Sequence, residues 1–182
     1  TAPLPTAGLA GQQVLLLPLT LVAAEEALHW DAIIADRRGT LAKGDSVIAS
    51  LIPGRAPEVS WVLPAALRRA ARRAAGVAAD PDQMGTAILR AEDLSLVPDP
   101  LRSQLRTLTA LAGTGRYALV PAALVFRKSK AAAAGVATAE LTVVLVDVRL
   151  GKVGVQTIAH GEGDDPWTAL TRAVKALTPG LP

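Results

Sequence analysis

The sequence of 182 residues contains no cysteine. This absence excludes disulfide bonds, thiolate nucleophiles and metal sites built on cysteine, and it is compatible with every redox compartment. Histidine is almost as scarce, since the chain has only His29 and His160, and neither has a second ligand at metal-binding spacing. The sequence therefore predicts no metal ion and no cofactor.

Aromatic residues are also rare, at 3% of the chain, whereas apolar residues make up 51%. The apolar share comes mainly from Ala, Leu and Val, which build a core of small side chains. Helices can approach a sheet closely in such a core, and we expect no large ligand cavity lined by aromatic rings. We therefore expect no small-molecule substrate.

Long apolar runs are absent as well, because no stretch reaches the roughly 20 residues of a membrane-spanning helix. A protein of this kind would be peripheral to a membrane, and any signal peptide or lipid anchor would precede Thr1. Lys and Arg total 19 and Asp and Glu 16, which gives a net charge of +3. Nucleic-acid binding needs a concentrated basic face rather than a small surplus, so we expect no nucleic-acid partner.

The second half of the chain predicts the fold. Residues 117–126 and 141–148 are strands that are apolar on both faces, and a turn leads into a third strand at 153–158. Strands of this type must be covered on both faces. We predict one α/β domain with a mixed sheet of about five strands and helices on its faces. Its last three strands form an antiparallel meander with Gly151 at positive φ in the turn, and a final helix follows Asp165-Pro166.

The first half is less regular. Residues 1–12 are rich in Pro, Ala and Gly and read as an extended arm or tether, so we place the α/β domain at residues 13–182. Gln13–Leu19 is the first strand and Val59–Leu63 the second. The pattern between them blurs at residues 20–44, which we read as an irregular or short helical excursion.

Several residues mark helix boundaries. Asp45 is a plausible N-cap for a short helix that Pro53-Gly54 ends, and Pro64 opens a helix that stops at Gly76. Asp followed by Pro is a recurrent start signal, because Pro lacks the N–H that would be unpaired at the first helical position. The chain has three such pairs, at residues 80–81, 99–100 and 165–166.

The Gly44-Asp45-Ser46 motif raises a hydrolase as an alternative, with Ser46 as nucleophile and His160 as base. Hydrolases with a Gly-Asp-Ser nucleophile place it directly after the first strand and need an Asn block and a late Asp-x-x-His. This chain has no asparagine, and residue 157 is Thr. The simpler interpretation is that Ser46 is a helix residue and that the protein is not an enzyme.

The densest basic feature comprises Arg68, Arg69, Arg72 and Arg73. Their spacing places them on one side of a helix, and a solvated face is the default interpretation. A module that binds nucleic acid or an anionic surface is the alternative. Interleaved aromatic residues and helix-turn-helix spacing, which would favour nucleic acid, are both missing.

Three segments together resemble a known group of domains. They are Val-Leu-Leu-Leu-Pro at 14–18, Arg-Tyr-Ala-Leu-Val-Pro at 116–121 and the hairpin Val-Asp-Val-Arg-Leu-Gly-Lys-Val at 146–153. The arrangement resembles the N-terminal domain of the translocation protein TolB, the curli-secretion lipoproteins and the lipoprotein activators of peptidoglycan synthases. The long excursion at 20–44 departs from that pattern. The resemblance implies a non-catalytic, periplasmic or envelope-associated domain, commonly lipid-tethered, that docks on other envelope proteins.

We therefore predict an exported accessory or scaffold subunit of a larger membrane-bound assembly. Peptidoglycan synthesis, secretion and a bioenergetic complex such as a photosynthetic reaction centre are all compatible with it. Three segments are candidates for contact with partners, namely the arm, the excursion and the long, rather apolar hairpin loop at 128–138. The candidate partner-binding residues are Leu4, Pro5, Trp30, Ile33, Ile34, Lys128, Lys130 and Val136.

Overall fold

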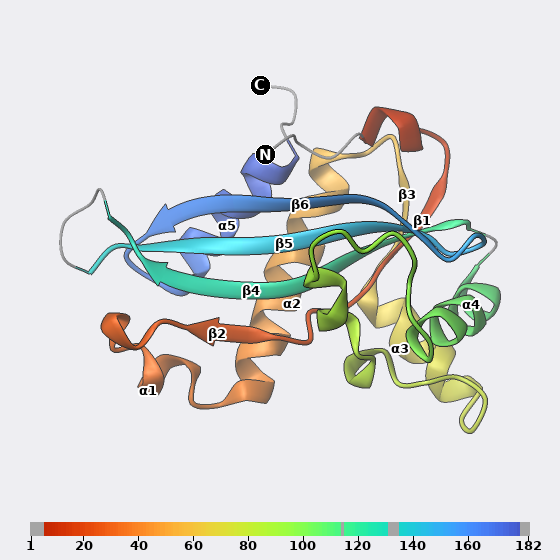
Figure 1. Ribbon diagram of the computed structural model, residues 1–182, viewed down its shortest axis with the longest axis horizontal. Helices are drawn as coiled ribbons and strands as arrows, with labels where there is room; N and C mark the ends of the chain where they lie inside the picture. The colour runs from red at the N-terminus through yellow and green to blue at the C-terminus, as the bar shows by residue number, and fades with distance from the viewer. Residues whose placement is uncertain (1–5, 114, 131–134, 179–182) are drawn as a thin grey trace.

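The computed structural model describes residues 6–113, 115–130 and 135–178. They form one mixed six-stranded sheet with helices on both faces (Figure 1). Side by side lie β3 (Ser60–Val62), β1 (Gln13–Leu16), β4 (Tyr117–Lys128), β5 (Ala137–Asp147) and β6 (Lys152–Gly163), and β2 (Val22–Ala24) pairs with β4. The predicted α/β class is therefore confirmed.

Strand β1 is the centre of the parallel part of the sheet, since it pairs in parallel with both β3 and β4. The connection from β1 to β3 contains α2 (Arg37–Arg55), and the one from β3 to β4 contains α3 (Pro64–Arg73) and α4 (Leu101–Ala112). Helix α2 packs on one face of the sheet, whereas α3 and α4 pack on the other. The C-terminal ends of β1 and β3 thus lie between helices from opposite faces, where α/β sheets commonly bind ligands.

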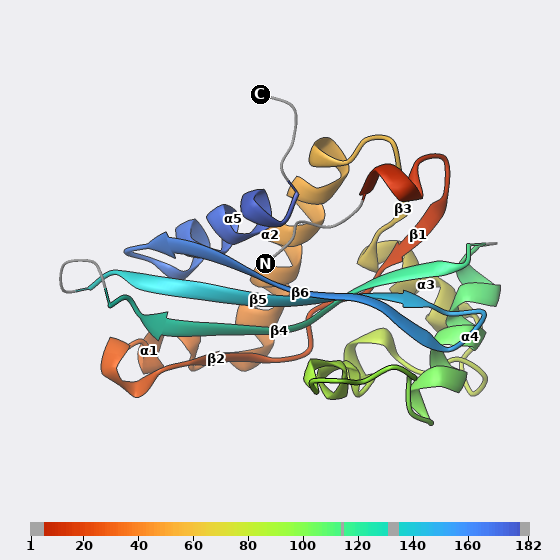
Figure 2. The ribbon, with the colours of Figure 1, turned by 45° about the horizontal axis from the view of Figure 1, so that its top comes forward.

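The last three strands form the predicted antiparallel meander. Gly151 in the turn between β5 and β6 has φ 65°, as expected of a glycine in a tight turn. Asp147 stabilises the same turn, because its carboxylate accepts a 3.0 Å hydrogen bond from the Leu150 N–H. The predicted final helix is α5 (Pro166–Leu177), which lies against β5 and β6 (Figure 2).

The excursion at residues 20–44 is more regular than predicted. Strand β2 pairs in parallel with residues 124–126 of β4, and the 3-10 helix η2 (Glu26–Leu28) and the short helix α1 (Asp31–Ile34) follow it. Strand β1 pairs with the first part of β4 and β2 with its last part. Two short strands therefore share one edge of β4, on either side of Pro18, which has no N–H to donate to a strand partner.

The prediction that Asp45 caps a short helix is wrong, because α2 begins at Arg37. Asp36 is the N-cap, and its carboxylate accepts a 3.1 Å hydrogen bond from the Gly39 N–H. Asp45 lies inside the helix, and its side chain forms an ion pair with Arg68 of α3. Gly44 interrupts the helical pattern in the sequence, but a methyl group there would press against Leu19, so its small size lets α2 lie close to that side chain.

Two of the three Asp-Pro pairs start a helix in the predicted way, with Asp as the N-cap and Pro at the first helical position. The Asp165 carboxylate accepts hydrogen bonds of 2.9 and 3.0 Å from two N–H groups in the first turn of α5. Asp80 accepts one from the Asp82 N–H at the start of the 3-10 helix η3 (Pro81–Gln83). The third pair departs from the prediction, because α4 begins at Leu101 and Pro100 is its N-cap. Asp99 lies one residue earlier and accepts a 3.3 Å hydrogen bond from the Ser103 N–H.

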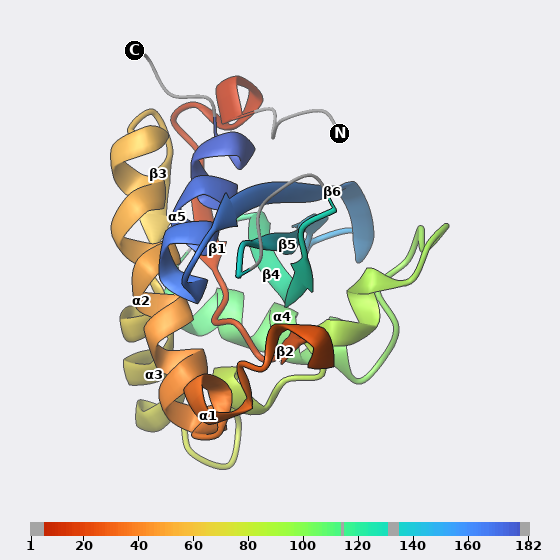
Figure 3. The same cartoon turned by 90° about the vertical axis from the view of Figure 1, so that its left-hand side faces the viewer.

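The core has two apolar clusters, one on each face of the sheet. Alternate residues of β1 point to opposite faces, so Leu16 packs in the cluster with α2 and α5 and Leu15 in the cluster with α3 and α4. Figure 3, which looks along the sheet, shows α2 and α5 on the same side of it. Gly161 and Gly163 of β6 face α5, whose backbone a methyl group at either position would meet.

The described part of the predicted arm contains a 3-10 helix, η1 (Thr6–Leu9). Leu9 is buried in the cluster on the α2 face. The Gly11 N–H donates a 2.9 Å hydrogen bond to the Glu58 carbonyl, which attaches this segment to the residues that precede β3. The division of the chain at residue 12 stays a prediction.

Candidate functional site

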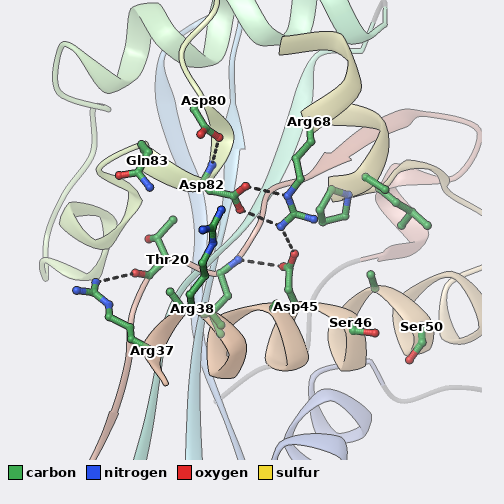
Figure 4. A pocket seen from close by; sticks show the side chains of 17 residues that line it. Thr20, Arg37, Arg38, Asp45, Ser46, Ser50, Arg68, Asp80, Asp82 and Gln83 are labelled. Carbon is green, nitrogen blue, oxygen red and sulfur yellow. Dashed lines mark hydrogen bonds and ion pairs between the residues drawn. The ribbon is translucent and has the colours of Figure 1, made fainter. Parts of the chain in front are cut away.

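A groove of about 1040 Å³ lies between α2 and the start of α3, at the C-terminal ends of β1 and β3 (Figure 4). One wall is formed by α2 between Arg37 and Ser50. The other is formed by residues 63–65 and Arg68, which open α3, and by η3 with Asp80 before it. We call this feature the α2–α3 groove.

Arg68 crosses the groove and pairs with two carboxylates. Its Nη2 lies 2.6 Å from Asp45 Oδ2 and 2.9 Å from Asp82 Oδ1, and its Nε donates a 2.9 Å hydrogen bond to Asp82 Oδ2. Asp45 also accepts a 3.1 Å hydrogen bond from the Leu19 N–H. These three side chains therefore join α2, α3, η3 and the segment after β1.

Burial governs the electrostatics of this cluster. Asp45 is only 5% exposed, and burial raises its pKa although the hydrogen bonds from Arg68 and from the Leu19 N–H act to lower it. The pKa of Arg68 is raised, above all by its hydrogen bond to Asp82, so Arg68 stays charged. The ionised form of Asp45 is costly at this depth and depends on Arg68 as its partner.

One end of the groove carries two further arginines from α2. Arg37 donates a long hydrogen bond of 3.4 Å to the Thr20 carbonyl. Arg38 reaches from α2 into the groove (Figure 4), and within residues 6–113, 115–130 and 135–178 it has no hydrogen-bond or ion-pair partner. Its guanidinium is available to an anionic or hydrogen-bond-accepting group of a ligand.

The other end of the groove is lined by small or apolar side chains. Figure 4 shows Ser46 and Ser50 on α2 at this end, beyond the ion pair. Ala49 precedes Ser50 on α2, and the groove is also lined by Leu63, Pro64 and Ala65 around the start of α3. Side chains this short leave room for a backbone to approach the two helices closely.

The structure does not bring Ser46 and His160 together. Ser46 belongs to α2, which covers one face of the sheet. Gly161 of β6 faces α5 on that same face, so its neighbour His160 points to the opposite face, where its Nε2 lies 3.9 Å from Glu140. The sheet separates the two residues that the hydrolase alternative requires. No group of three or more His, Asp or Glu in the described ranges could hold a metal ion.

The candidate residues of the excursion differ in exposure. Trp30 is 7% exposed and packs edge-to-face on Phe126, with the ring centroids 5.4 Å apart. Ile34 is half-buried, whereas Ile33 is 50% exposed. Ile33 therefore offers the most surface of the three, and a role in partner binding stays a prediction for each of them.

The loop between β4 and β5 is shorter than the predicted range of 128–138, because β4 ends at Lys128 and β5 starts at Ala137. Lys128 and Lys130 are exposed and Val136 is half-buried. Residues 131–134 of the same loop lie outside the described residues. The arm residues Leu4 and Pro5 also lie outside them.

The four arginines of α3 do not form one uniform face. Arg68 departs from the prediction because its side chain is only 30% exposed and pairs with two carboxylates. Arg69, Arg72 and Arg73 are exposed, and none has a hydrogen-bond or ion-pair partner in the part of the chain that the structure describes. The solvated basic face thus consists of three residues.

The ion-pair cluster was missed by the sequence prediction. Asp45 is 23 positions from Arg68, and Asp82 is 14 positions from it, so no helical spacing relates them. One signal was present, because Asp45 precedes Ile48 and Ile52 at the spacing of a buried stripe. An aspartate on such a stripe needs a partner. Arg68 of α3 supplies it here.

The fold places this chain among α/β domains with a final helix packed on an antiparallel meander. No protein-family model matches the sequence, and the comparison with curated proteins gives no match. The C-terminal domain of LpoB from Salmonella enterica is 13% identical, with a TM-score of 0.42, and the match covers 86% of this chain and 84% of that one.

Two further solved structures are similar to this chain. A dodecameric PelC from Paraburkholderia phytofirmans is 14% identical, with a TM-score of 0.41 and coverage of 98% and 96% of the two chains. A lipoprotein from Neisseria meningitidis is 14% identical, with a TM-score of 0.37 and coverage of 84% and 81%. One of them is a lipoprotein and all three are bacterial proteins. Identities this low concern the fold alone.

Within the described residues, no helix combines the length and the apolar character that crossing a bilayer requires.

Proposed function

We propose that this protein is a non-catalytic accessory or scaffold subunit of the bacterial envelope that docks on a larger membrane-bound protein assembly. The observation that carries the proposal is the α2–α3 groove. Arg68 is occupied there by two carboxylates, whereas Arg38 has no partner among the described residues. The groove presents a cation and a surface of small side chains beside a fixed ion pair, and this combination suits recognition of a partner.

The dimensions of the groove favour a segment of polypeptide as the partner's contribution. The α2 wall runs from Arg37 to Ser50, which at 1.5 Å per residue is about 20 Å. An extended chain of about six residues spans that length. An acceptor or carboxylate of the segment would meet Arg38, and its backbone would lie over the small side chains at the other end.

The charges that line the groove support the same kind of partner. Three arginines and three aspartates face it, so the lining as a whole is neutral. They are Arg37, Arg38, Arg68, Asp45, Asp80 and Asp82. A polyanion such as nucleic acid would meet the aspartates as well as the arginines, whereas a polypeptide can place one polar group at a time.

The cellular setting of the proposal is the periplasmic side of the envelope, peripheral to the membrane. The resemblance to envelope lipoproteins supports this placement. A peptidoglycan-synthesis complex, a secretion complex or a bioenergetic complex such as a photosynthetic reaction centre would each offer the large membrane-bound partner that the proposal requires.

Photo-crosslinking in native membranes tests the proposal. A photoreactive amino acid at Ser50 lies in the groove, and one at Ile158 lies on the opposite face of the sheet and serves as the matched control. We expect a crosslink to one membrane protein from position 50 that is absent from position 158 and is lost when Arg38→Glu is added. A version that lacks residues 1–5 tests the arm while it keeps η1 and the buried Leu9 in place. If the protein runs as a free monomer and position 50 gives no crosslink, the docking proposal is wrong.

A further inference from the structure

We propose that the outer side of α3 binds anionic lipid headgroups at a membrane surface. The α3 outer surface consists of Arg69, Arg72, Arg73 and Val77. The proposal goes beyond docking on a protein, because it concerns direct contact between this domain and lipid.

The outer side of α3 carries a positive charge that no neighbouring side chain among the described residues offsets. Arg69, Arg72 and Arg73 follow the i, i+3, i+4 spacing that places side chains on one stripe of a helix. All three are exposed, and none is neutralised by another group in the described part of the chain. Residues 64–79 contain no aspartate or glutamate. The stripe is therefore a local positive charge without a counter-ion from the protein.

The aspartates that follow α3 do not compensate this charge. Asp82 is taken by the two-point contact with Arg68, which points away from the outer stripe into the groove. Asp80 accepts the N–H of Asp82 at the start of η3. Both carboxylates belong to the groove wall.

An exposed apolar side chain follows the arginines in the chain. Val77 is 72% exposed, more than any other large apolar residue in the described ranges. It follows Gly76, whose φ of 86° turns the chain after the end of α3. Figure 1 shows this turn projecting at the lower right of the molecule. An aliphatic side chain on a projecting turn beside basic residues is typical of a segment that enters the headgroup region of a bilayer.

The residues around the three arginines distinguish between the possible anionic partners. Residues 64–79 contain no aromatic side chain that could stack on a base, which disfavours single-stranded nucleic acid. A bilayer offers phosphate to the guanidinium groups and an apolar boundary to Val77 at the same time. The observations thus favour an anionic lipid surface, and an acidic protein surface becomes an outcome of the test.

Vesicle co-sedimentation is the experiment. The probes are vesicles of phosphatidylglycerol with phosphatidylethanolamine, and vesicles of phosphatidylcholine alone. We compare the unmodified protein with the triple variant R69E/R72E/R73E and with the triple variant K128E/K130E/K175E, which changes the net charge equally at exposed positions away from α3, on the β4–β5 hairpin and on α5. Circular dichroism checks that each variant is folded. The variant R69Q/R72Q/R73Q repeats the test without introducing negative charge near the end of α3.

We expect binding to the phosphatidylglycerol vesicles that weakens as salt is added, because surface charges are screened. Each arginine near an anionic surface contributes about fivefold to the partition coefficient, so the loss for three is about a hundredfold. The distant triple variant should change binding less than threefold by the same reasoning. Val77→Asp should also weaken binding.

Three results would overturn the proposal. One is equal binding to both kinds of vesicle, and a second is equal binding by the α3 triple variants and the unmodified protein. The third is binding of a polyglutamate peptide without any vesicle binding, which would assign the surface to an acidic protein. The vesicles contain no protein, so a failure to bind them leaves the docking proposal for the α2–α3 groove intact. In the same way, a missing crosslink from position 50 leaves the lipid-binding proposal for the α3 outer surface intact.

Discussion

Asp45 and Arg68 connect helices that cover opposite faces of the sheet. Asp45 comes from α2 and Arg68 from α3, and the two side chains are 2.6 Å apart. The contact lies beyond the C-terminal ends of β1 and β3, where the two layers of helices meet at the edge of the sheet. The walls of the α2–α3 groove are held at a fixed separation by this pair.

The pair provides a stability prediction. Asp45→Ala should lower the free energy of unfolding by about 2–3 kcal/mol, because the Leu19 N–H loses its acceptor and Arg68 loses its most buried partner. Urea unfolding followed by circular dichroism measures the change. Asp82→Ala is the matched control. Asp82 is 41% exposed, so its removal should cost about 1 kcal/mol or less. Equal costs for the two variants would show that the burial of Asp45 is unimportant.

A second prediction concerns Gly151 in the turn between β5 and β6. Gly151→Ala should destabilise the protein by about 1–3 kcal/mol, because φ is 65° there and the new methyl group would meet the Arg102 side chain. Gly76→Ala is the control, since φ is 86° at Gly76 but the space around it is open. We expect Gly151→Ala to lower the free energy of unfolding more than Gly76→Ala does. In an Arg102→Ala background, the difference between the two glycine substitutions should become smaller. A Gly151→Ala protein as stable as the unmodified one in thermal unfolding would contradict the prediction.

A third prediction concerns pH. The pKa of Asp165 is lowered by hydrogen bonds from the Thr168 side chain and N–H and from the Trp167 N–H. The unfolded chain therefore takes up this proton first as the pH falls. The stabilisation is fully present above the unfolded pKa, about 3.9, and is lost as the pH falls from there toward the folded pKa.

Asp165→Asn tests the pH prediction, because asparagine caps a helix but does not titrate. At neutral pH the unmodified protein should be the more stable of the two, since a charged cap also interacts with the helix dipole. Its advantage in chemical unfolding should shrink once the pH falls below about 4. A constant difference between pH 7 and pH 3 would show that Asp165 does not titrate differently in the two states.

A fourth prediction concerns Ser46. Ser46→Ala should change the free energy of unfolding by no more than about 0.5 kcal/mol, because the residue is exposed on α2. It should also leave the hydrolysis of a p-nitrophenyl ester at the level of the unmodified protein, since the sheet separates Ser46 from His160. Turnover that depends on both residues would revive the hydrolase alternative.

The second half of the fold could be predicted from the sequence because its signals are local. Continuous apolar runs mark β4 and β5, Gly151 marks the turn between β5 and β6, and Asp165-Pro166 marks the start of α5. The first half could not, because Val22–Ala24 is too short to carry a strand pattern and becomes a strand only by pairing with β4. The α2–α3 groove could not be predicted either, because it also depends on a long-range contact. Asp45 and Arg68 meet only after two helices have packed on opposite faces of the sheet.

The segment at residues 20–44 covers part of a sheet edge through β2. Strand β2 covers the backbone of β4 from Leu124 to Phe126, which is apolar and would otherwise present unpaired N–H and C=O groups at an open edge. Open apolar edges are templates for pairing with other chains and a route to aggregation. The covering strand comes from near the start of the chain and the covered one from its second half, so this contact has to form across a long loop. The edge of β4 is therefore vulnerable during folding, and substitutions that weaken β2 should first show themselves as a loss of solubility.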